Sequence, residues 1–211
     1  MRLKHIKGSK EYIEKSSYLI LNPETNKGKW QDFFGNFNPI HIEIGMGRGD
    51  FIIGMAQNHP EVNYIGIEMY DSVIYKAVKK LESLDRTLPN LFLIRMDATE
   101  ICNVFDREIS RIYLNFSDPW PKAKHEKRRL TSKQFLERYD NIFKNSKEIF
   151  QKTDNNDLFK FSIESLTNYG YSLKNVSHDL YSEMIPDNVA TEYETKFVKE
   201  GTKINRLEAY K

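Results

Sequence analysis

Acidic side chains directly follow three consecutive predicted strands, and a glycine-rich turn follows the first of these strands. Glu43 precedes Gly45-Met46-Gly47-Arg48-Gly49-Asp50, Glu68 follows the second strand, and Asp97 follows the third. Open α/β sheets bind ligands at the carboxyl ends of their strands, so these side chains should line one crevice. Glu68 there can accept hydrogen bonds from both hydroxyls of a ribose, and Asp97 can accept one from the exocyclic amine of adenine. The set therefore predicts a nucleoside site.

The spacing of the glycines separates two classes of nucleoside cofactor. Glycines let the backbone turn sharply and approach a ligand closely, but the dinucleotide fingerprint requires Gly-x-Gly-x-x-Gly. Here the spacing is Gly-x-Gly-x-Gly, and Asp50 stands where the last glycine of the fingerprint is expected. A carboxylate there opposes a diphosphate, whereas S-adenosylmethionine has no phosphate and carries a sulfonium and an ammonium group that Glu43 can face. The pattern favours S-adenosylmethionine over NAD; the alternative is a plain turn with helix-capping acids.

A rigid turn follows the fourth predicted strand. Its sequence is Ser117-Asp118-Pro119-Trp120-Pro121-Lys122, and the two prolines fix the backbone and prevent the strand from continuing. Such a turn would hold Asp118 at the crevice as a hydrogen-bond acceptor and Trp120 as a stacking surface. The alternative interpretation is a tight exit from the strand, with Trp120 in the core.

Two short segments concentrate positive charge in a chain whose formal net charge is only +2. Residues 1–10 carry Arg2, Lys4, Lys7 and Lys10 and no acidic residue. Residues 122–129 carry five basic side chains against one acidic side chain. Local basic patches on a nearly neutral protein favour a polyanion that docks at defined places. The alternative is two ordinary solvated surface segments.

The elements that must position these side chains alternate along the chain. Short apolar runs predict strands at 39–44, 64–67, 91–94, 111–116 and 149–152, with two more at 171–178 and 204–210. Helical patterns lie between them at 50–58, 72–84, 132–143 and 157–168, and a polar helical stretch separates the last two strands. Strands that alternate with helices indicate βαβ units and a largely parallel sheet. The predicted class is therefore α/β, doubly wound, with an antiparallel edge strand.

The length of 211 residues fits one domain with a short N-terminal extension. We expect a basic and polar extension over residues 1–30, followed by the α/β domain over 31–211. The charge and polarity of the extension suggest mobility, and its order in the absence of RNA is left open. The single cysteine, Cys102, excludes an internal disulfide and favours a reducing compartment. Because no secretory signal or long apolar run is seen, we expect a cytoplasmic protein with no membrane contact. The His and Cys residues lack zinc-site spacing, so we expect no metal.

The longest motif resembles a family of RNA-modifying enzymes. Tyr113-Leu114-Asn115-Phe116-Ser117-Asp118-Pro119-Trp120-Pro121-Lys122, followed by His125-Glu126-Lys127-Arg128-Arg129-Leu130, is similar to the bacterial tRNA (guanine-N7-)-methyltransferase family. Lys152-Thr153-Asp154-Asn155 and Thr191-Glu192-Tyr193-Glu194 match later motifs of that family in order and spacing. The resemblance covers essentially the whole chain. One departure is Asn145-Ser146-Lys147, where the family usually has glycines in a turn before the fifth strand; this puts the local turn in doubt.

The resemblance implies a fold, a reaction and a set of roles. The fold would be a Rossmann-like methyltransferase domain with a seven-stranded sheet, and the reaction would be methyl transfer from S-adenosylmethionine to N7 of a guanine in the variable loop of tRNA. Asp118 would be the catalytic residue. The cofactor would be bound by Glu43, Gly45, Gly47, Glu68, Asp97 and Asp118. The substrate would be contacted by Lys122, Asp154, Thr191, Glu192, Tyr193 and Glu194, and RNA by Lys124, His125, Glu126, Lys127, Arg128 and Arg129.

The chemistry of guanine N7 limits what these residues have to do. N7 has a lone pair and no proton, so no general base is needed, and the work is alignment in a dry site. Asp118 would orient the partners and favour the positive charge that arrives on the guanine. Asp154 and Glu194 would accept hydrogen bonds from its amide and amino groups. On the residues alone, Thr191-x-x-Glu194 is better explained as a capping box, and both roles can coexist.

Three other functions compete with this interpretation. A methyltransferase of the same fold could act on another substrate, or a non-catalytic RNA-binding protein could have kept the fold. The glycine spacing makes an NAD oxidoreductase the least favoured. We expect tRNA as the partner and either a monomer or a homodimer.

Overall fold

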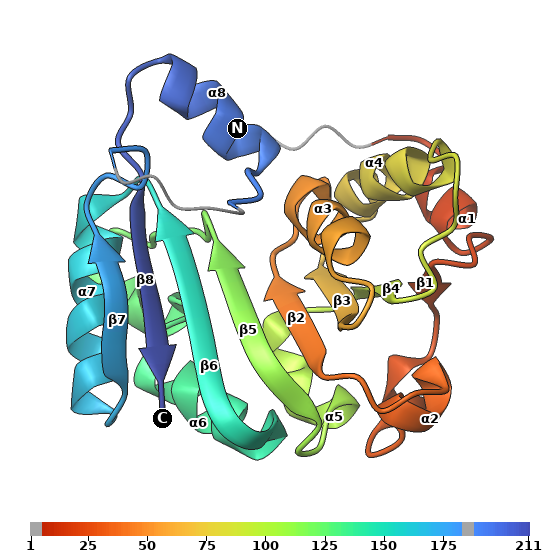
Figure 1. Ribbon diagram of the computed structural model, residues 1–211, viewed down its shortest axis with the longest axis horizontal. Coiled ribbons are helices and arrows are strands. Elements are labelled where there is room, and N and C mark those ends of the chain that lie inside the picture. Colours follow the sequence, from red (N-terminus) through yellow and green to blue (C-terminus); the bar gives the residue numbers. More distant parts are fainter. Residues whose placement is uncertain (1–5, 183–187) are drawn as a thin grey trace.

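The computed structural model describes residues 6–182 and 188–211, which form one sheet between two layers of helices (Figure 1). The strands are β1 (Leu19–Ile20), β2 (Ile40–Ile44), β3 (Asn63–Glu68), β4 (Leu91–Arg95), β5 (Ile109–Asn115), β6 (Phe143–Thr153), β7 (Ser172–Ser177) and β8 (Asn205–Tyr210). The α-helices are α1 (Ser9–Ile13), α2 (Trp30–Phe34), α3 (Asp50–Asn58), α4 (Asp71–Glu82), α5 (Ile101–Val104), α6 (Lys133–Ile142), α7 (Asn156–Asn168) and α8 (Glu192–Lys199). Short 3-10 helices are η1 (Pro23–Asn26), η2 (Ala98–Glu100) and η3 (Ala123–Arg128). Within these two described ranges, no helix is both long and apolar enough to cross a membrane.

The strand order is β1-β4-β3-β2-β5-β6-β8-β7. All neighbours from β1 to β6 pair in parallel, whereas β8 pairs antiparallel with both β6 and β7. The predicted doubly wound α/β class is confirmed. The winding reverses between β2 and β5, and open sheets bind ligands at the carboxyl ends of the strands beside such a switch point. The turns after β2, β3, β4 and β5 are therefore brought to one edge.

The sheet differs from the predicted one in three details. It has eight strands rather than seven, because the short β1 pairs with β4 through Leu19 and Leu93. The antiparallel strand β8 lies between β6 and β7, so the antiparallel pairs are at this edge but the outermost strand is β7. The segment Asn145-Ser146-Lys147 is part of β6 and not a turn, since Lys147 and Lys211 exchange backbone hydrogen bonds at 2.9 and 3.0 Å.

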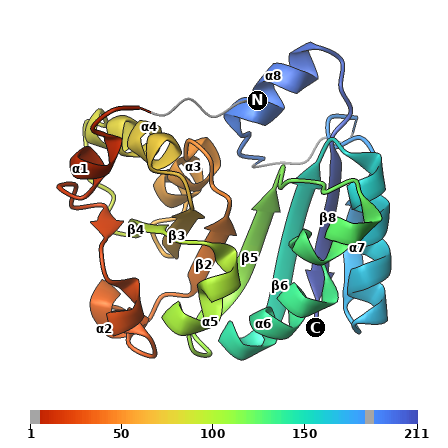
Figure 2. The ribbon, with the colours of Figure 1, turned by 180° about the vertical axis from the view of Figure 1, so that it is seen from behind.

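Each face of the sheet has its own core, and alternation along the strands decides which side chain enters which core. Ile40, Ile42 and Ile44 of β2 face the core formed with α5, α6 and α7 (Figure 2). Tyr64 and Tyr113 face the other core, which α1, α3 and α4 cover. His41 contacts both of these tyrosine rings, at centroid distances of 5.7 and 5.9 Å, so the odd-numbered side chains of β2 lie on the α3 side.

Residues 6–30, the described part of the predicted N-terminal extension, pack against the α/β domain. Ile13 of α1 and Trp30 of α2 are fully buried, and Trp30 Nε1 donates to Val104 O at 2.9 Å. α1 packs on α4, where the rings of Tyr12 and Tyr75 lie 5.0 Å apart. Apolar anchors spaced along a polar segment are enough to dock it. Arg2 and Lys4 of the predicted basic patch lie outside the described residues, and the division at residue 30 stays a prediction.

Candidate active site

The glycine turn after β2 ties the ends of two strands together. Gly45, Gly47 and Gly49 have φ values of 76°, 58° and 80°, a left-handed conformation that glycine adopts without steric cost. The backbone amide of Gly45 donates to Ile67 O at 2.8 Å, and the amide of Gly47 donates to Glu68 Oε2 at 3.3 Å. The predicted glycine turn and the predicted acid after β3 therefore form one unit at the carboxyl edge.

Glu68 is held rigidly at the end of β3. Its Oε1 accepts from the backbone amides of Met69 and Tyr70 at 2.8 and 3.2 Å. Burial raises the pKa of Glu68, and the negative charge of Asp118 acts in the same direction. The carboxylates of Glu68 and Asp118 therefore lie close enough to interact, although they come from β3 and from the turn after β5.

Asp97 follows β4 as predicted, and its side chain is exposed. Its Oδ1 accepts from the amide and the hydroxyl of Thr99 at 2.8 and 2.7 Å, so Asp97 caps η2. Asp97 therefore has the helix-capping role that the sequence left open as an alternative to cofactor binding. Both bonds go to one oxygen, which leaves Oδ2 without a donor from the described residues and available to a ligand. Capping and the predicted contact with adenine are compatible.

Glu43 is fully buried at the end of β2. Its Oε1 accepts from Asn115 Nδ2 at 2.9 Å, while its Oε2 has no hydrogen-bond partner within the described ranges. Desolvation raises the pKa of Glu43 to about 8, against the opposing effects of the Asn115 hydrogen bond and the positive charge of Lys152. At neutral pH this carboxyl is mostly protonated, and a cation beside it would favour the ionised form.

The turn after β5 presents Asp118 at the rim of the crevice. Asp118 is exposed and accepts no hydrogen bond from the part of the chain that the structure describes, and Trp120 is half-buried, so Trp120 is not a core residue. Phe116 and Trp120 have positive φ values of 52° and 43°, which cost a non-glycine residue about 1–3 kcal/mol each. Such strain persists only where other contacts hold it, and Phe116 N donates to Lys152 O at 2.8 Å.

Helix α8 lies over the carboxyl ends of β5 and β6 and over the amino end of the antiparallel strand β8 (Figure 1). Thr191 and Glu194 form a capping box, since Glu194 N donates to Thr191 Oγ1 at 2.9 Å and Thr191 N donates to Glu194 Oε2 at 3.2 Å. The half-exposed Tyr193 donates its hydroxyl to Asp154 Oδ2 at 3.2 Å, and its ring lies 5.0 Å from that of Phe116. α8 thus brings both later motifs to the turn that carries Asp118.

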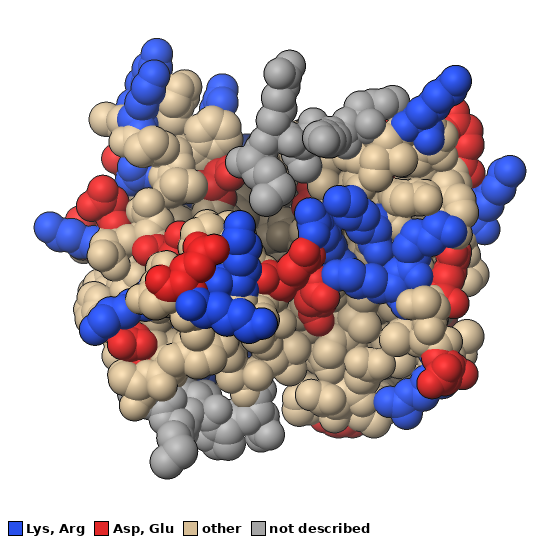
Figure 3. Space-filling view, turned by 90° about the horizontal axis from the view of Figure 1, so that it is seen from above, with Lys and Arg blue, Asp and Glu red and all other residues tan. Residues whose placement is uncertain are grey.

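A second contact joins α8 to the glycine turn. Glu192 forms an ion pair with Arg48 and lies 3.9 Å from Lys80 Nζ, which in turn pairs with Asp50 at 2.5 Å. A cavity of about 530 Å³ adjoins this contact, lined by Asp50, Thr191, Glu192 and the next turn of α8. Seen from the carboxyl edge, acidic side chains lie near the middle of the face beside a hollow, with Lys and Arg side chains on both sides (Figure 3).

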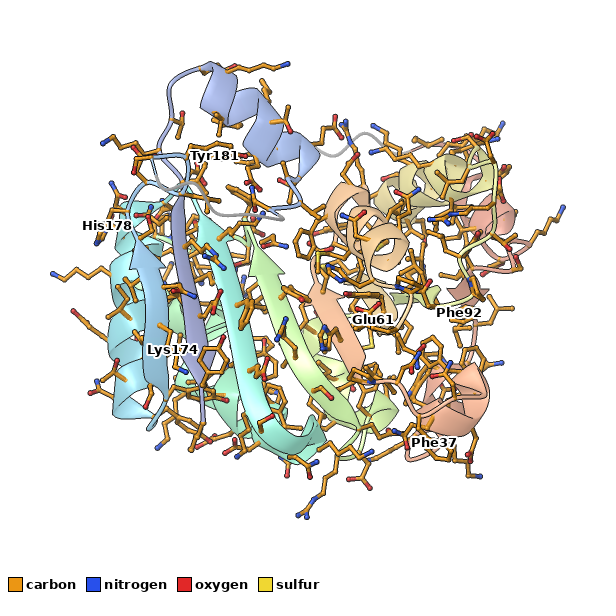
Figure 4. All side chains as sticks on the ribbon, in the orientation of Figure 1. Phe37, Glu61, Phe92, Lys174, His178 and Tyr181 are labelled. Atoms are coloured by element: carbon orange, nitrogen blue, oxygen red, sulfur yellow. The ribbon has the colours of Figure 1, made fainter. Side chains whose placement is uncertain are left out.

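Glu194 is completely enclosed, and its carboxylate is fully engaged. Its Oε2 accepts from Lys152 Nζ at 2.6 Å, and its Oε1 accepts from the hydroxyl of Tyr181 and from Asn188 Nδ2, both at 2.9 Å. Lys152 Nζ also donates to Val189 O at 2.9 Å. Burial lowers the pKa of Lys152, and the pairing with Glu194 opposes that shift. Tyr181 lies beneath α8 in Figure 4. In this conformation both oxygens of Glu194 already accept hydrogen bonds from the protein, so neither is open to a guanine. The predicted contact between Glu194 and guanine stays a prediction.

Known proteins resemble this chain over its whole length. A family model described as "Putative methyltransferase" matches residues 37–207. The tRNA (guanine-N(7)-)-methyltransferase of Lachnoclostridium phytofermentans is 50% identical over 213 residues, which cover 100% of this chain and 99% of the relative. The protein of the same name from Streptococcus equi subsp. zooepidemicus is 51% identical over 211 residues, 99% of each chain. The chain belongs to the tRNA (guanine-N7-)-methyltransferase family.

Solved methyltransferases share the fold of this family member at low sequence identity. A structure described as an antibiotic-related methyltransferase has a TM-score of 0.66 and 18% identity, and it covers 87% of this chain and 92% of its own. A SAM-dependent methyltransferase from Archaeoglobus fulgidus has a TM-score of 0.54 and 14% identity, with coverage of 90% and 94%. The predicted Rossmann-like methyltransferase fold is confirmed. The chain is an enzyme, a methyltransferase, and S-adenosylmethionine stays its predicted cofactor.

The carboxyl edge of this methyltransferase fits that cofactor. The unpartnered Oε2 of Glu43 is an enclosed acceptor, and a sulfonium or an ammonium group beside it would favour the ionised form of this carboxyl. An added Cβ at Gly45 or Gly47 would project into open space rather than into protein, so the backbone there is open to a ligand. The individual assignments of Glu43, Gly45, Gly47, Glu68, Asp97 and Asp118 to the cofactor stay predictions. Among the described residues no cluster of three or more His, Cys, Asp or Glu side chains is placed to hold a metal ion.

The predicted RNA-binding segment, residues 122–129, forms η3 beside the Asp118 turn. Most of its charged side chains are exposed, namely those of Lys122, Lys124, Glu126, Lys127 and Arg128. His125 is half-buried, and its ring lies 5.7 Å from that of Trp120. Arg129 differs because its side chain is only 12% exposed. The segment therefore combines an exposed basic surface with one inward-facing arginine.

Asn115 and Lys152 are structural partners that the sequence did not single out. Each holds a carboxylate of the site, Glu43 and Glu194 respectively. Strand alternation is the sequence pattern that could have identified Asn115. This residue stands two positions after the buried Tyr113 and so falls on the same face of β5. A polar residue at the buried, carboxyl end of a strand is a candidate to hold a site carboxylate.

Replacing Lys152 by Met is expected to loosen α8. Removal of one partner of a buried ion pair leaves an uncompensated charge and lowers the free energy of unfolding by about 3–5 kcal/mol. Urea unfolding measures this loss. The control is Arg48→Gln, which removes a more exposed pair with Glu192 and should cost no more than about 1 kcal/mol. Equal unfolding midpoints for Lys152→Met and the wild-type protein would show that the pair does not hold α8.

Binding of S-adenosylmethionine is expected to release a proton from Glu43. The pKa of this buried carboxyl is raised to about 8, so the neutral form prevails at neutral pH, and approaching positive charge favours ionisation. Affinity should therefore rise as the pH approaches about 8. Calorimetry at neutral pH in two buffers with different ionisation enthalpies measures the release. It should vanish in Glu43→Gln; identical heats in both buffers for the wild-type protein would exclude it.

Proposed function

We propose that this enzyme transfers the methyl group of S-adenosylmethionine to N7 of a guanine in the variable loop of tRNA. The observation that carries the proposal is the position of the Asp118 turn between the acid-lined crevice and the exposed basic residues of η3. A base that enters the crevice would meet Asp118, while its phosphates would meet η3. The full-length relatives named tRNA (guanine-N(7)-)-methyltransferase support the same substrate.

The residues of the chain supply alignment and electrostatics. When bound, the cofactor supplies a methyl group activated by a positively charged sulfur. Guanine N7 attacks with its lone pair, so no side chain needs to remove a proton. Asp118 orients the guanine and stabilises the positive charge that arrives on it. The bound base would shield this exposed carboxylate from water and so strengthen its effect on a charge that develops beside it. The strained turn keeps this carboxylate in place before the reaction.

Recognition of guanine is assigned to the rim formed by Asp154 and Tyr193. Guanine presents an amide N–H and an amino group on its Watson–Crick edge, and an acidic acceptor such as Asp154 favours these donors over the edge of adenine. The half-exposed ring of Tyr193 lies next to Phe116 and offers a stacking surface for a base that has left its own stack. Thr191 and Glu194 hold this rim through the capping box, and Lys122 lies at the start of the basic segment.

The RNA is positioned by its backbone. Lys124, Lys127 and Arg128 are exposed and would contact phosphates, which fix register without reading sequence. The shape of tRNA then selects the substrate. The proposal places the enzyme in the cytoplasm, as a monomer or homodimer, with an N-terminal extension over residues 1–30 that adds to the RNA contact.

The direct test is methyl transfer from labelled S-adenosylmethionine to unmodified tRNA, with the product nucleoside identified by mass spectrometry. Formation of 7-methylguanosine in the variable loop is the expected result. If the protein binds the cofactor but methylates no tRNA, the substrate assignment is wrong, and a methyltransferase of the same fold with another substrate takes its place. A tRNA complex without any methyl transfer would instead indicate an RNA-binding protein.

A further inference from the structure

Arg129 points into the protein, unlike the other basic residues of the 122–129 segment. Its Nε donates to Pro119 O at 3.1 Å, and its Nη2 donates to Trp120 O at 3.2 Å. The guanidinium carbon lies 4.4 Å from the centroid of the Phe161 ring on α7. A planar fork that both donates to two acceptors and stacks on a ring is a geometry that arginine provides and lysine does not.

The two carbonyls that Arg129 holds belong to the turn that carries Asp118. Trp120 has a φ of 43°, so the turn needs outside contacts to keep this conformation. Phe116, at the other end of the turn, is held by Lys152 O. Arg129 and β6 thus hold the two strained ends, and Asp118 lies between them.

The neighbouring arginine has a different environment. Arg128 is exposed, and its guanidinium lies over the ring of Trp120, 4.8 Å from the ring centroid. A phosphate can reach Arg128 without disturbing the turn. Arg129 is only 12% exposed, and its remaining nitrogen, Nη1, lies 4.0 Å from Glu126 Oε2. A phosphate at Arg129 would therefore compete with Glu126 and with the contacts that the guanidinium makes to the turn and to Phe161. The positive charge that these two arginines share therefore does not tell which of them can contact phosphate and which holds the turn.

We propose that Arg129 is a positioning residue for methyl transfer, which clamps the Asp118 turn onto α7, and that phosphate binding belongs to its exposed neighbours. The inference rests on the proposed function, because it takes Asp118 to act where the methyl group is transferred. Through Arg129, the segment 122–129 that would contact the RNA also holds the turn that carries Asp118.

The test compares Arg129→Lys with Lys124→Gln. Arg129→Lys keeps the charge but loses the fork and the stacking, so the single-turnover rate at saturating tRNA should fall by about 10- to 100-fold, as expected for a misplaced group. The tRNA dissociation constant should change by less than about twofold, with an unchanged salt dependence. Lys124→Gln should instead weaken tRNA binding and flatten the salt dependence by about one phosphate contact.

A second variant, Phe161→Leu, removes the stacking surface and leaves every charge in place; a smaller fall in rate with unchanged tRNA affinity is expected. The inference is overturned if Arg129→Lys weakens tRNA binding and flattens its salt dependence as Lys124→Gln does. It is also overturned if the Arg129→Lys variant loses affinity for S-adenosylhomocysteine and thermal stability along with its single-turnover rate. Arg129 would then merely support the fold. Failure of the wild-type protein to methylate tRNA would refute the proposed function instead.

Discussion

Replacement of Asp118 by Ala is expected to lower the single-turnover rate of methyl transfer by about 10²- to 10³-fold, the loss typical of one preorganised electrostatic contact to developing charge. Positive charge moves onto the guanine during the reaction, and Asp118 is the exposed carboxylate at the turn between the crevice and η3. Rapid-quench measurement with labelled S-adenosylmethionine at saturating tRNA gives the rate constant.

Asp118→Asn is the matched variant, because it keeps the shape of the side chain and removes only its charge. A loss as large as that of Asp118→Ala would assign the effect to charge, and a near-normal rate would assign it to orientation by hydrogen bonding. Removal of the negative charge also lowers the pKa of Glu68, which Asp118 partly raises. The affinity of both variants for S-adenosylhomocysteine separates the predicted contact of Asp118 with the cofactor from its role at the guanine. Near-normal turnover of Asp118→Ala would contradict the catalytic role.

Simultaneous replacement of Lys124, Lys127 and Arg128 by Gln is expected to reduce tRNA affinity by about 100-fold or more, since each charged contact is worth at least about 1 kcal/mol. The slope of log affinity against log salt concentration should become shallower by about 2, because fewer counterions are released from the RNA. Binding titrations at several salt concentrations measure both quantities. The affinity for S-adenosylhomocysteine should not change, since these side chains are exposed on η3.

Lys133→Gln is the control for this triple variant. Lys133 is 80% exposed on α6, outside the basic segment, and lies 3.9 Å from Glu137. It carries the same charge change per residue without belonging to the proposed surface, so it should leave the salt dependence as it is. Loss of cofactor binding in the triple variant would show that η3 supports the fold; an unchanged salt dependence would show that RNA docks elsewhere.

Most elements of the fold were predictable because their signals are local. Strands β2 to β5 and helices α3 and α4 occur within a few residues of the predicted positions, since alternation, glycines and prolines within ten residues decide them. β1 was missed because two residues carry no periodicity; its pairing with β4 decides its conformation. The place of β8 between β6 and β7 is likewise a matter of pairing between distant segments.

By itself, the sequence determined the doubly wound sheet, the acids at the strand ends, the rigid turn at Asp118 and the family. Only the tertiary structure decided which charged side chains are enclosed. Glu43 meets Asn115 across 72 residues, and Lys152 meets Glu194 across 42, so no local pattern could pair them. Arg129 shows the same limit within a single motif, because the five basic residues from 122 to 129 are alike in charge and only packing against Phe161 turns one of them inward. The cost of burying a charge depends on partners that the fold brings from elsewhere, and this is why burial, unlike alternation, is decided in three dimensions.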